Sequence, residues 1–405
     1  MRIRFLVGAK LLEVLSRGVF ILFCTYSLPL VDAGKFGLTS TVIGLTSFLI
    51  GFERLIDVQR RMAGASQVVI HQQLRGTLHF FGVQYAFVLP ILAFLLGLIA
   101  QWPPFIVGLF ILIAVGEHLA NQAYLMTLID REAHAFLLAV VFKNILLLIA
   151  IFLGKWHTPN DFNLFWVMHI WGLASLLFIT IVTVLWHRRT RLFQTQNIAL
   201  PSPQRIPEQY RASKLHFLMG LAAIIALQAD RFVVGATLSA EDIGIYFRNI
   251  TLAGLALQFF SIVSYARISP DIYRLGREGA LIQARKTVKT EYHRFALVLI
   301  CLIGLALGIN FVMHNPASRF HIAAPFVAIL TVGVLLRTAA DYSGLLLLSA
   351  GADTRLFHHQ ITSVIVGLPC MALMAALLGL PGAFSGTLIA PAILLALNMN
   401  STGKP

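Results

Sequence analysis

The sequence is poor in charge and in cysteine. Charged residues occupy 12% of its 405 positions, about half of their share in soluble domains. The three cysteines, Cys24, Cys301 and Cys370, fall in apolar stretches, and no spaced pair of them predicts a disulfide or a metal site. With 58% hydrophobic residues and a mean hydropathy of +0.82, the composition identifies an integral membrane protein and excludes an ordinary soluble domain.

Long apolar stretches fill most of the chain. A helix needs about 20 residues to cross the hydrocarbon of a bilayer, and about twelve stretches meet this length. We predict spans at 5–29, 37–57, 77–99, 104–126, 135–154, 163–186, 214–237, 243–266, 293–313, 322–349, 358–379 and 381–398. The last two are separated only by Gly379-Leu-Pro381-Gly382. The first stretch carries Glu13 and Arg17 and has no small-residue cleavage site after it, so we expect a retained span and not a signal peptide.

Lysine and arginine are distributed unevenly over the loops. An even number of spans places both termini on one side of the membrane. The loops on that side hold 21 of the 31 basic residues, the opposite loops hold only Lys35, Lys155 and Arg319, and seven lie within spans. Because cytoplasmic loops collect Lys and Arg, we predict cytoplasmic termini. The same rule accounts for the net charge of +14 without any nucleic-acid partner.

Two long basic connections divide the chain. Residues 187–213 contain three prolines and predict a cytoplasmic linker between two six-helix halves, 1–186 and 214–405. Residues 267–292 are basic and partly amphipathic. They predict a helix on the inner membrane surface that is attracted to anionic lipid, with a solvated loop as the alternative.

The two halves are weakly similar in sequence. Asp32-Ala-Gly34-Lys-Phe36 follows the first span, and Asp242-Ile-Gly244-Ile-Tyr246 follows the seventh, at an offset of 210 residues. A glycine ahead of an aromatic residue at an outer helix entrance predicts a tight turn followed by an interfacial ring. Repeated halves with a site between them are typical of transporters that rock to give alternating access.

Ionisable side chains lie inside many of the spans, where each costs about 2.5–3.5 kcal/mol on insertion scales. The interior set comprises Lys10, Glu13, Arg17, Glu53, Arg54, Glu117, Lys143, Asp230, Arg231, Arg248, Arg337 and Asp341. So many charges predict a wet interior that lines a transport path. The basic members outnumber the acidic members by two, which suits an anionic substrate better than a cationic drug.

The charges of the first half form one stripe and one pair. Lys10, Glu13 and Arg17 share a helix face at i, i+3 and i+7, and we expect this stripe to face a cavity; the alternative is a self-paired set used in packing. Arg17 lies deepest and is the better candidate for a phosphate ligand. Glu117 and Lys143 both lie mid-span, where one is expected to neutralise the other.

The charges of the second half need partners on other helices. Asp230 and Arg231 are adjacent and therefore point about 100° apart. Arg248 is the candidate partner for Asp230, as substrate contact or as a gate or brace. Arg337 and Asp341 form an i, i+4 pair that we interpret as structural. In the first half, Glu53 and Arg54 lie near the inner end of span two and are expected to snorkel.

One stretch of the second half resembles a known family. It reads Gln228-Ala-Asp230-Arg231, continues through an apolar run with Gly235, and ends at Asp242-Ile-Gly244-Ile-Tyr246. Together with Ile268-Ser-Pro270, Leu15-Ser16-Arg17-Gly18 and Gly34-Lys-Phe36-Gly37, this stretch is similar to the corresponding segments of Wzx-type polysaccharide flippases. The span count and the central linker also fit this resemblance.

The resemblance implies an all-α fold of about twelve membrane helices in two halves, like that of MATE transporters and other members of the multidrug/oligosaccharidyl-lipid/polysaccharide (MOP) exporter superfamily. It implies movement of an undecaprenyl-diphosphate-linked sugar repeat unit across the bacterial inner membrane, for O-antigen, capsule or exopolysaccharide. The expected partners are this lipid-linked oligosaccharide, membrane lipids and other polysaccharide assembly proteins. The related lipid II branch usually has two extra spans, which this sequence does not predict.

Two other functions compete with the flippase. One is an ion-coupled MATE-like drug exporter on the same fold. The other is a membrane-embedded glycosyltransferase or polymerase, against which the short outer loops argue. The sequence contains no GxxxxGK[ST], HExxH or GxSxG motif, so we expect no ATP hydrolysis, enzymatic chemistry, cofactor or metal. Glu13, Glu117 and Asp230 are the candidate carriers of a coupling proton.

Overall fold

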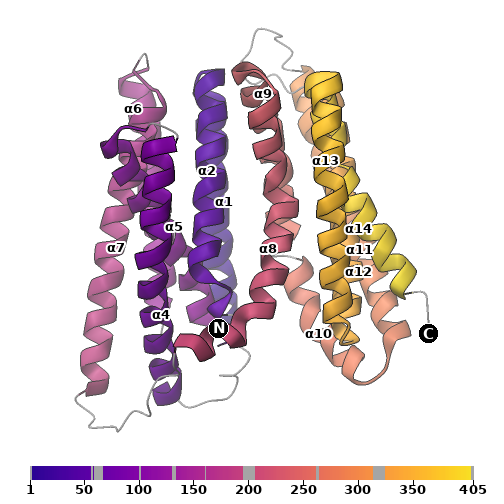
Figure 1. The fold of residues 1–405 in the computed structure, drawn as a ribbon, viewed down its shortest axis with the longest axis horizontal. Helices are drawn as coiled ribbons and strands as arrows, with labels where there is room; N and C mark the ends of the chain where they lie inside the picture. The colour runs from indigo at the N-terminus through magenta and orange to yellow at the C-terminus, as the bar shows by residue number, and fades with distance from the viewer. Residues whose placement is uncertain are drawn as a thin grey trace. The chain divides into compact units, whose positions relative to one another are not determined.

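The chain folds into helices. The computed structural model describes residues 2–55, 58, 67–99, 102–129, 134–159, 161–194, 206–260, 264–312 and 324–402, and these contain no strand. The earlier helices are α1 (Arg2–Ser27), α2 (Leu30–Gly51), α4 (Gln67–Phe94), α5 (Pro104–Ile129), α6 (His134–His157) and α7 (Leu164–Gln194). They are followed by α8 (Ile206–Thr237), α9 (Ala240–Phe260), α10 (Ala266–Arg277), α11 (Leu281–Val312), α12 (Ala324–Ser349), α13 (Asp353–Gly386) and α14 (Ile389–Thr402) (Figure 1).

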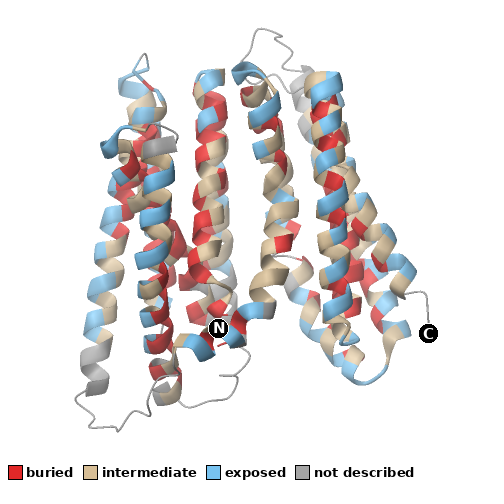
Figure 2. Cartoon of the chain, viewed as in Figure 1, coloured by how far each residue is buried: buried red, intermediate tan, exposed pale blue. Residues whose placement is uncertain are grey.

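The helices confirm the predicted fold class, an all-α polytopic membrane protein. In the described part of the chain, nine helices are long and apolar enough to cross a membrane, and a helix occurs in each of the twelve predicted spans. Large apolar side chains are exposed along several of them, for example Leu173 (61%), Leu305 (62%) and Leu377 (72%). Figure 2 shows exposed positions running along the length of α13. Apolar surface of this extent fits contact with lipid. Of the predicted linker 187–213, residues 195–205 lie outside the described residues.

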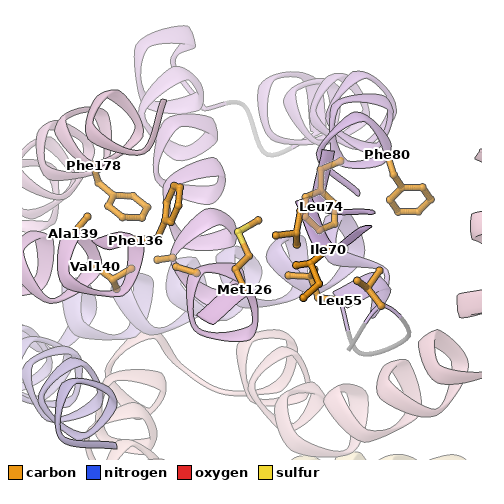
Figure 3. Close-up of a cluster of buried hydrophobic side chains, with 13 residues drawn as sticks. Leu55, Ile70, Leu74, Phe80, Met126, Phe136, Ala139, Val140 and Phe178 are labelled. Atoms are coloured by element: carbon orange, nitrogen blue, oxygen red, sulfur yellow. The ribbon is translucent and has the colours of Figure 1, made fainter. Parts of the chain in front are cut away.

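The chain forms two compact units. The first comprises Met1–Phe20 and Thr39–Leu221. One apolar cluster in it gathers side chains of α4, α5, α6 and α7, among them Leu74, Met126, Phe136 and Phe178 (Figure 3). This cluster holds together the helices that carry Glu117 and Lys143.

The second unit comprises Ile21–Leu38 and Ala222–Pro405. The end of α1 and the start of α2 therefore belong to the second unit, although both helices begin or continue in the first. Its core has one cluster around Val234, Tyr246 and Phe384 and another around Phe260 and Tyr342. The basic segment after α9 is helical, as α10 and the first turns of α11, so the alternative of a solvated loop is wrong.

The chain reverses at Gly379 as predicted. Gly379 has φ 63° and ψ −141°, a conformation outside the helical region although α13 extends to either side of it. Beyond it the chain runs back along α13: a Cβ on Gly382 would lie 2.0 Å from the Met374 carbonyl oxygen, and one on Gly386 would lie 2.6 Å from Met371 Cγ. Glycine permits both the turn and the close approach.

The repeated glycine motifs lie inside helices, so the predicted tight turns are wrong. Gly34 belongs to α2 and Gly244 to α9, because both helices begin earlier than the apolar pattern suggested. The two glycines meet within the second unit: a Cβ on Gly34 would lie 3.1 Å from the Gly244 nitrogen, and one on Gly244 would lie 2.1 Å from the Leu30 carbonyl oxygen. The rings of Phe36 and Tyr246 are fully buried and are not interfacial.

The end of α2 also differs from the prediction. Phe52 and Glu53 have left-handed φ angles of 46° and 53°, a conformation that costs about 1–3 kcal/mol per non-glycine residue. This turn stacks Phe52 on Phe217 of α8, with ring centroids 4.0 Å apart. Arg54 is 1% exposed, so this side chain does not snorkel to the membrane surface.

Candidate functional site

Glu117 is the centre of a charged cluster in the first unit. Its carboxylate accepts from Lys143 Nζ at 2.5 Å and from Trp171 Nε1 at 3.0 Å, both on Oε1. Arg17 Nη2 lies 3.2 Å from the second oxygen, Oε2, and Arg17 Nη1 donates to Asn121 Oδ1 at 3.1 Å. Helices α1, α5, α6 and α7 therefore meet at one carboxylate. The expectation that Glu117 and Lys143 neutralise each other is confirmed.

A second ion pair lies one turn earlier on α1. Lys10 Nζ is 2.6 Å from Glu13 Oε2. The Glu13 carbonyl oxygen accepts from Asn144 Nδ2 at 3.4 Å, which joins this turn to α6 next to Lys143. The structure thus brings together the predicted residues Lys10, Glu13 and Arg17 with Glu117 and Lys143.

Exposure separates the members of this cluster. The side chains of Lys143 and Glu117 are 1% and 4% exposed, whereas those of Lys10 and Arg17 are 17% and 25% exposed. Arg17 and Lys143 share the single carboxylate of Glu117, while Lys10 and Glu13 balance each other. The cluster therefore has an excess positive charge, and its most accessible members are cations.

In the second unit, Asp230 and Arg248 bind different partners and not each other. The Tyr246 hydroxyl donates to Asp230 Oδ2. Arg248 donates from Nε to the Thr25 carbonyl oxygen and from Nη2 to that of Leu28, both at 3.1 Å. The predicted pairing of Arg248 with Asp230 is wrong, because Arg248 binds the carbonyl groups that the end of α1 leaves without helical partners.

A cavity of about 80 Å³ lies beside Asp230. Asp230 and Arg337 are its two charged lining residues, and the rest of the wall is mostly apolar, for example Leu330 and Met371. Arg337 Nε lies 3.0 Å from Asp341 Oδ1, which confirms the predicted i, i+4 pair. The volume admits a few water molecules, and Asp230 and Arg337 are the charged groups that such water would meet.

Sequence reasoning missed the neutral hydrogen-bond partners of both sites. Trp171 and Asn121 bind the Glu117 cluster, and Tyr246 binds Asp230. Each comes from a helix other than that of the residue it binds, so spacing along one helix carries no signal for them. The rotation of each helix about its own axis decides such contacts.

We predict that Tyr246→Phe destabilises the second unit by about 1–2 kcal/mol, because it removes the hydroxyl that binds the buried Asp230 carboxylate. The measurement is the melting temperature of the purified chain in detergent. Tyr292→Phe on α11, a half-buried ring, is the control. Equal melting temperatures for Tyr246→Phe and the wild type would contradict the assigned bond.

Solved membrane transporters share this architecture. A multidrug resistance MATE family transporter of the MOP superfamily, in an inward-facing conformation, aligns over 96% of this chain and 94% of its own with a TM-score of 0.68 and 13% identity. The lipid II flippase MurJ, in an inward closed conformation, aligns over 98% and 86% with a TM-score of 0.67 and 14% identity. A mutant of the Vibrio cholerae MATE transporter VcmN aligns over 99% and 95% with a TM-score of 0.63 and 14% identity.

These likenesses show that the chain has the same fold as these MATE transporters and MurJ. No protein-family model and no curated protein sequence matches the chain. At 13–14% identity the shared feature is the arrangement of helices in a multi-pass membrane protein. The features of this chain that bear on its activity are therefore its own charged clusters.

Proposed function

We propose that this protein is a flippase that moves undecaprenyl-diphosphate-linked oligosaccharide repeat units across the bacterial inner membrane by alternating access. The movement runs from the cytoplasmic to the periplasmic leaflet and serves the biosynthesis of a surface polysaccharide. In this proposal both termini are cytoplasmic, the two sequence halves at 1–186 and 214–405 are the moving parts, and other polysaccharide assembly proteins use the flipped unit.

The excess positive charge around Glu117 is the observation that carries this proposal. A diphosphate needs cationic donors, and a guanidinium offers it two parallel N–H groups. Arg17 is the most exposed member of the cluster. The other cation paired with Glu117, Lys143, keeps this carboxylate neutralised. Arg17 is thus able to turn toward a phosphate without leaving Glu117 as an unpaired charge.

Asp230 is the best placed of the candidate proton carriers. Glu13 and Glu117 are both ion-paired. Asp230 instead accepts from the neutral Tyr246 hydroxyl and lines the cavity of about 80 Å³. Water in that cavity would supply the proton. Arg231 and Arg248 complete the proposed polar path in the second unit.

A cation-coupled drug exporter is the second candidate. It is favoured by the MATE transporters among the similar structures. A cationic drug, however, would meet Arg17 and Lys10 as like charges in the first unit. Drug resistance that rises with expression of this chain and is unaffected by Arg17→Ala would support the exporter over the flippase.

The decisive experiment is deletion of the gene, followed by analysis of lipid-linked intermediates. A flippase deletion is expected to accumulate undecaprenyl-linked repeat units on the cytoplasmic leaflet, and a plasmid copy should clear them. Unchanged intermediates together with unchanged surface polysaccharide would contradict the proposal. Accumulation of polymerised glycan instead would favour a later step, such as that of a glycosyltransferase.

We predict that Arg17→Ala and Arg231→Ala each lower surface polysaccharide without loss of the protein from the membrane. Arg17→Ala removes a phosphate ligand but leaves the Lys143–Glu117 pair in place. The measurement is surface glycan per cell, normalised to the amount of membrane protein. Lys155→Ala, which alters a cation outside both clusters, is the control; wild-type glycan in both arginine variants would contradict the assigned path.

A further inference from the structure

Glu291 of α11 is ion-paired with two exposed arginines. Its side chain is 9% exposed and forms ion pairs with Arg267 of α10 and with Arg294, the latter between Nη1 and Oε1 at 2.8 Å. The two arginine side chains are themselves 60% and 67% exposed. Because a guanidinium carries five N–H donors, each retains donors beyond those that bind Glu291. The two guanidinium groups and the one carboxylate carry a net positive charge, and the ion pairs fix the positions of both guanidinium groups.

Helix α11, which carries Glu291 and Arg294, continues into a lipid-facing surface. Ile282, Lys286, Lys289, His293, Leu297 and Ile300 are all exposed, and their spacing follows the 3.6-residue period of one helix face. The face is basic from Lys286 to His293 and apolar from Leu297 onward, where Leu297 and Ile300 are 65% and 54% exposed. Apolar side chains at that exposure in a predicted span face hydrocarbon.

The basic part of this face therefore lies at headgroup depth. Lys289 precedes Arg294 by five residues, about 7.5 Å along a helix. The headgroup layer on each side of a bilayer is about 5–7 Å thick. Arg294 and Lys289 thus fall at the level of the lipid phosphates that cover the apolar part of α11.

The charged side of helix α10 faces outward because its apolar side is buried against the protein. Its apolar residues Ile268, Ile272 and Leu275 are buried in a cluster that also contains Ala284 and Val288 of α11. The apolar face of α10 is therefore covered within the protein, and α10 itself has no need to insert into the membrane. From 266 to 294 the chain has seven Lys and Arg against three Asp and Glu, and all seven basic side chains are exposed.

We propose that Arg267, Glu291 and Arg294 form a binding site for the phosphate of an anionic membrane lipid, with Lys286 and Lys289 strengthening the attraction. The guanidinium forks bind the phosphate oxygens, and Glu291 fixes their positions. Lipid is the occupant, and not an acidic protein, because the row of α11 that carries Arg294 continues at i+4, i+7 and i+11 into the exposed side chains of Val298, Cys301 and Leu305. The site is independent of the transported substrate.

The test uses a variant that removes all three charges of the triad together, so that none is left unpaired. In R267Q/E291Q/R294Q no buried carboxylate loses its partners, and the net charge falls by one. Arg355→Gln, at an exposed position near the start of α13, lowers the net charge by the same amount. The full chain is reconstituted in nanodiscs of phosphatidylcholine, and its affinity for added phosphatidylglycerol is measured by native mass spectrometry and by fluorescent-lipid transfer.

The wild type and Arg355→Gln are expected to prefer phosphatidylglycerol equally, and the triple variant to bind it at least tenfold more weakly. R267K/R294K, which keeps the charge but loses the forks, should fall between them and also serves if the triple variant misfolds. Affinity for phosphatidylglycerol should decrease as sodium chloride increases. Equal binding by all variants, or an equal loss in the triple variant and Arg355→Gln, overturns the proposed site.

Discussion

Replacing Glu117 with glutamine is expected to cost the first unit about 3 kcal/mol or more, because it leaves Lys143 charged and buried without a counter-ion. The Lys143 side chain is 1% exposed and its ammonium binds Glu117 at 2.5 Å. Glutamine retains the shape and one acceptor but loses the charge that Arg17 and Lys143 share. In a unit of this size the loss corresponds to a decrease of roughly 10 °C in melting temperature.

The measurement is the melting temperature of detergent-purified protein, together with the yield of monodisperse protein. Glu241→Gln, at an exposed position in the first turn of α9, is the matched control and should melt as the wild type does. The double variant Glu117→Gln/Lys143→Met removes both buried charges and should recover most of the loss. A single variant as stable as the wild type would show that Glu117 does not balance Lys143.

Gly244→Ala is the second change with a large expected effect, a destabilisation of about 1–3 kcal/mol from overpacking. A Cβ at this position would lie 2.1 Å from the Leu30 carbonyl oxygen. Backbone cannot rotate away as a side chain can, so α9 must shift from the start of α2. The shift would also strain the bonds from Arg248 to Thr25 and Leu28.

Gly254→Ala on the same helix is the matched control. No atom lies within 4 Å of a Cβ built at Gly254, and alanine is favoured over glycine in a helix by about 1 kcal/mol. The two substitutions are therefore expected to have opposite signs in a melting experiment. Gly37→Ala should be milder than Gly244→Ala, because the clash at Gly37 is with the Phe247 ring, which can move. Equal effects at positions 244 and 254 would contradict the close crossing.

The sequence predicted the features that depend on one helix or on depth in the membrane. The reversal at Gly379 follows from glycine and proline chemistry, and the Glu117–Lys143 pair follows from two opposite charges at mid-span. Arg337 and Asp341 are neighbours on one helix. None of these predictions needs knowledge of how one helix is rotated against another.

The features that failed or were missed depend on that rotation. Asp230 binds Tyr246 and Arg248 binds the end of α1, and no spacing along one helix specifies either partner. Gly34 and Gly244 were assigned to turns because hydropathy locates the apolar part of a helix and not its polar first turn. The left-handed turn that buries Arg54 reflects the stacking of Phe52 on Phe217, which is a tertiary contact.

The division of α1 and α2 between two units has a consequence for biosynthesis. The carbonyl of Leu28 can accept its hydrogen bond from Arg248 only after 220 further residues have been synthesised. At a synthesis rate of about 5–20 residues per second, the hairpin Ile21–Leu38 stays in the membrane without its partners for roughly 10–40 s. Translation that halts before α9 leaves this hairpin incomplete, so truncated chains should be recognised by membrane proteases even when the first unit has folded.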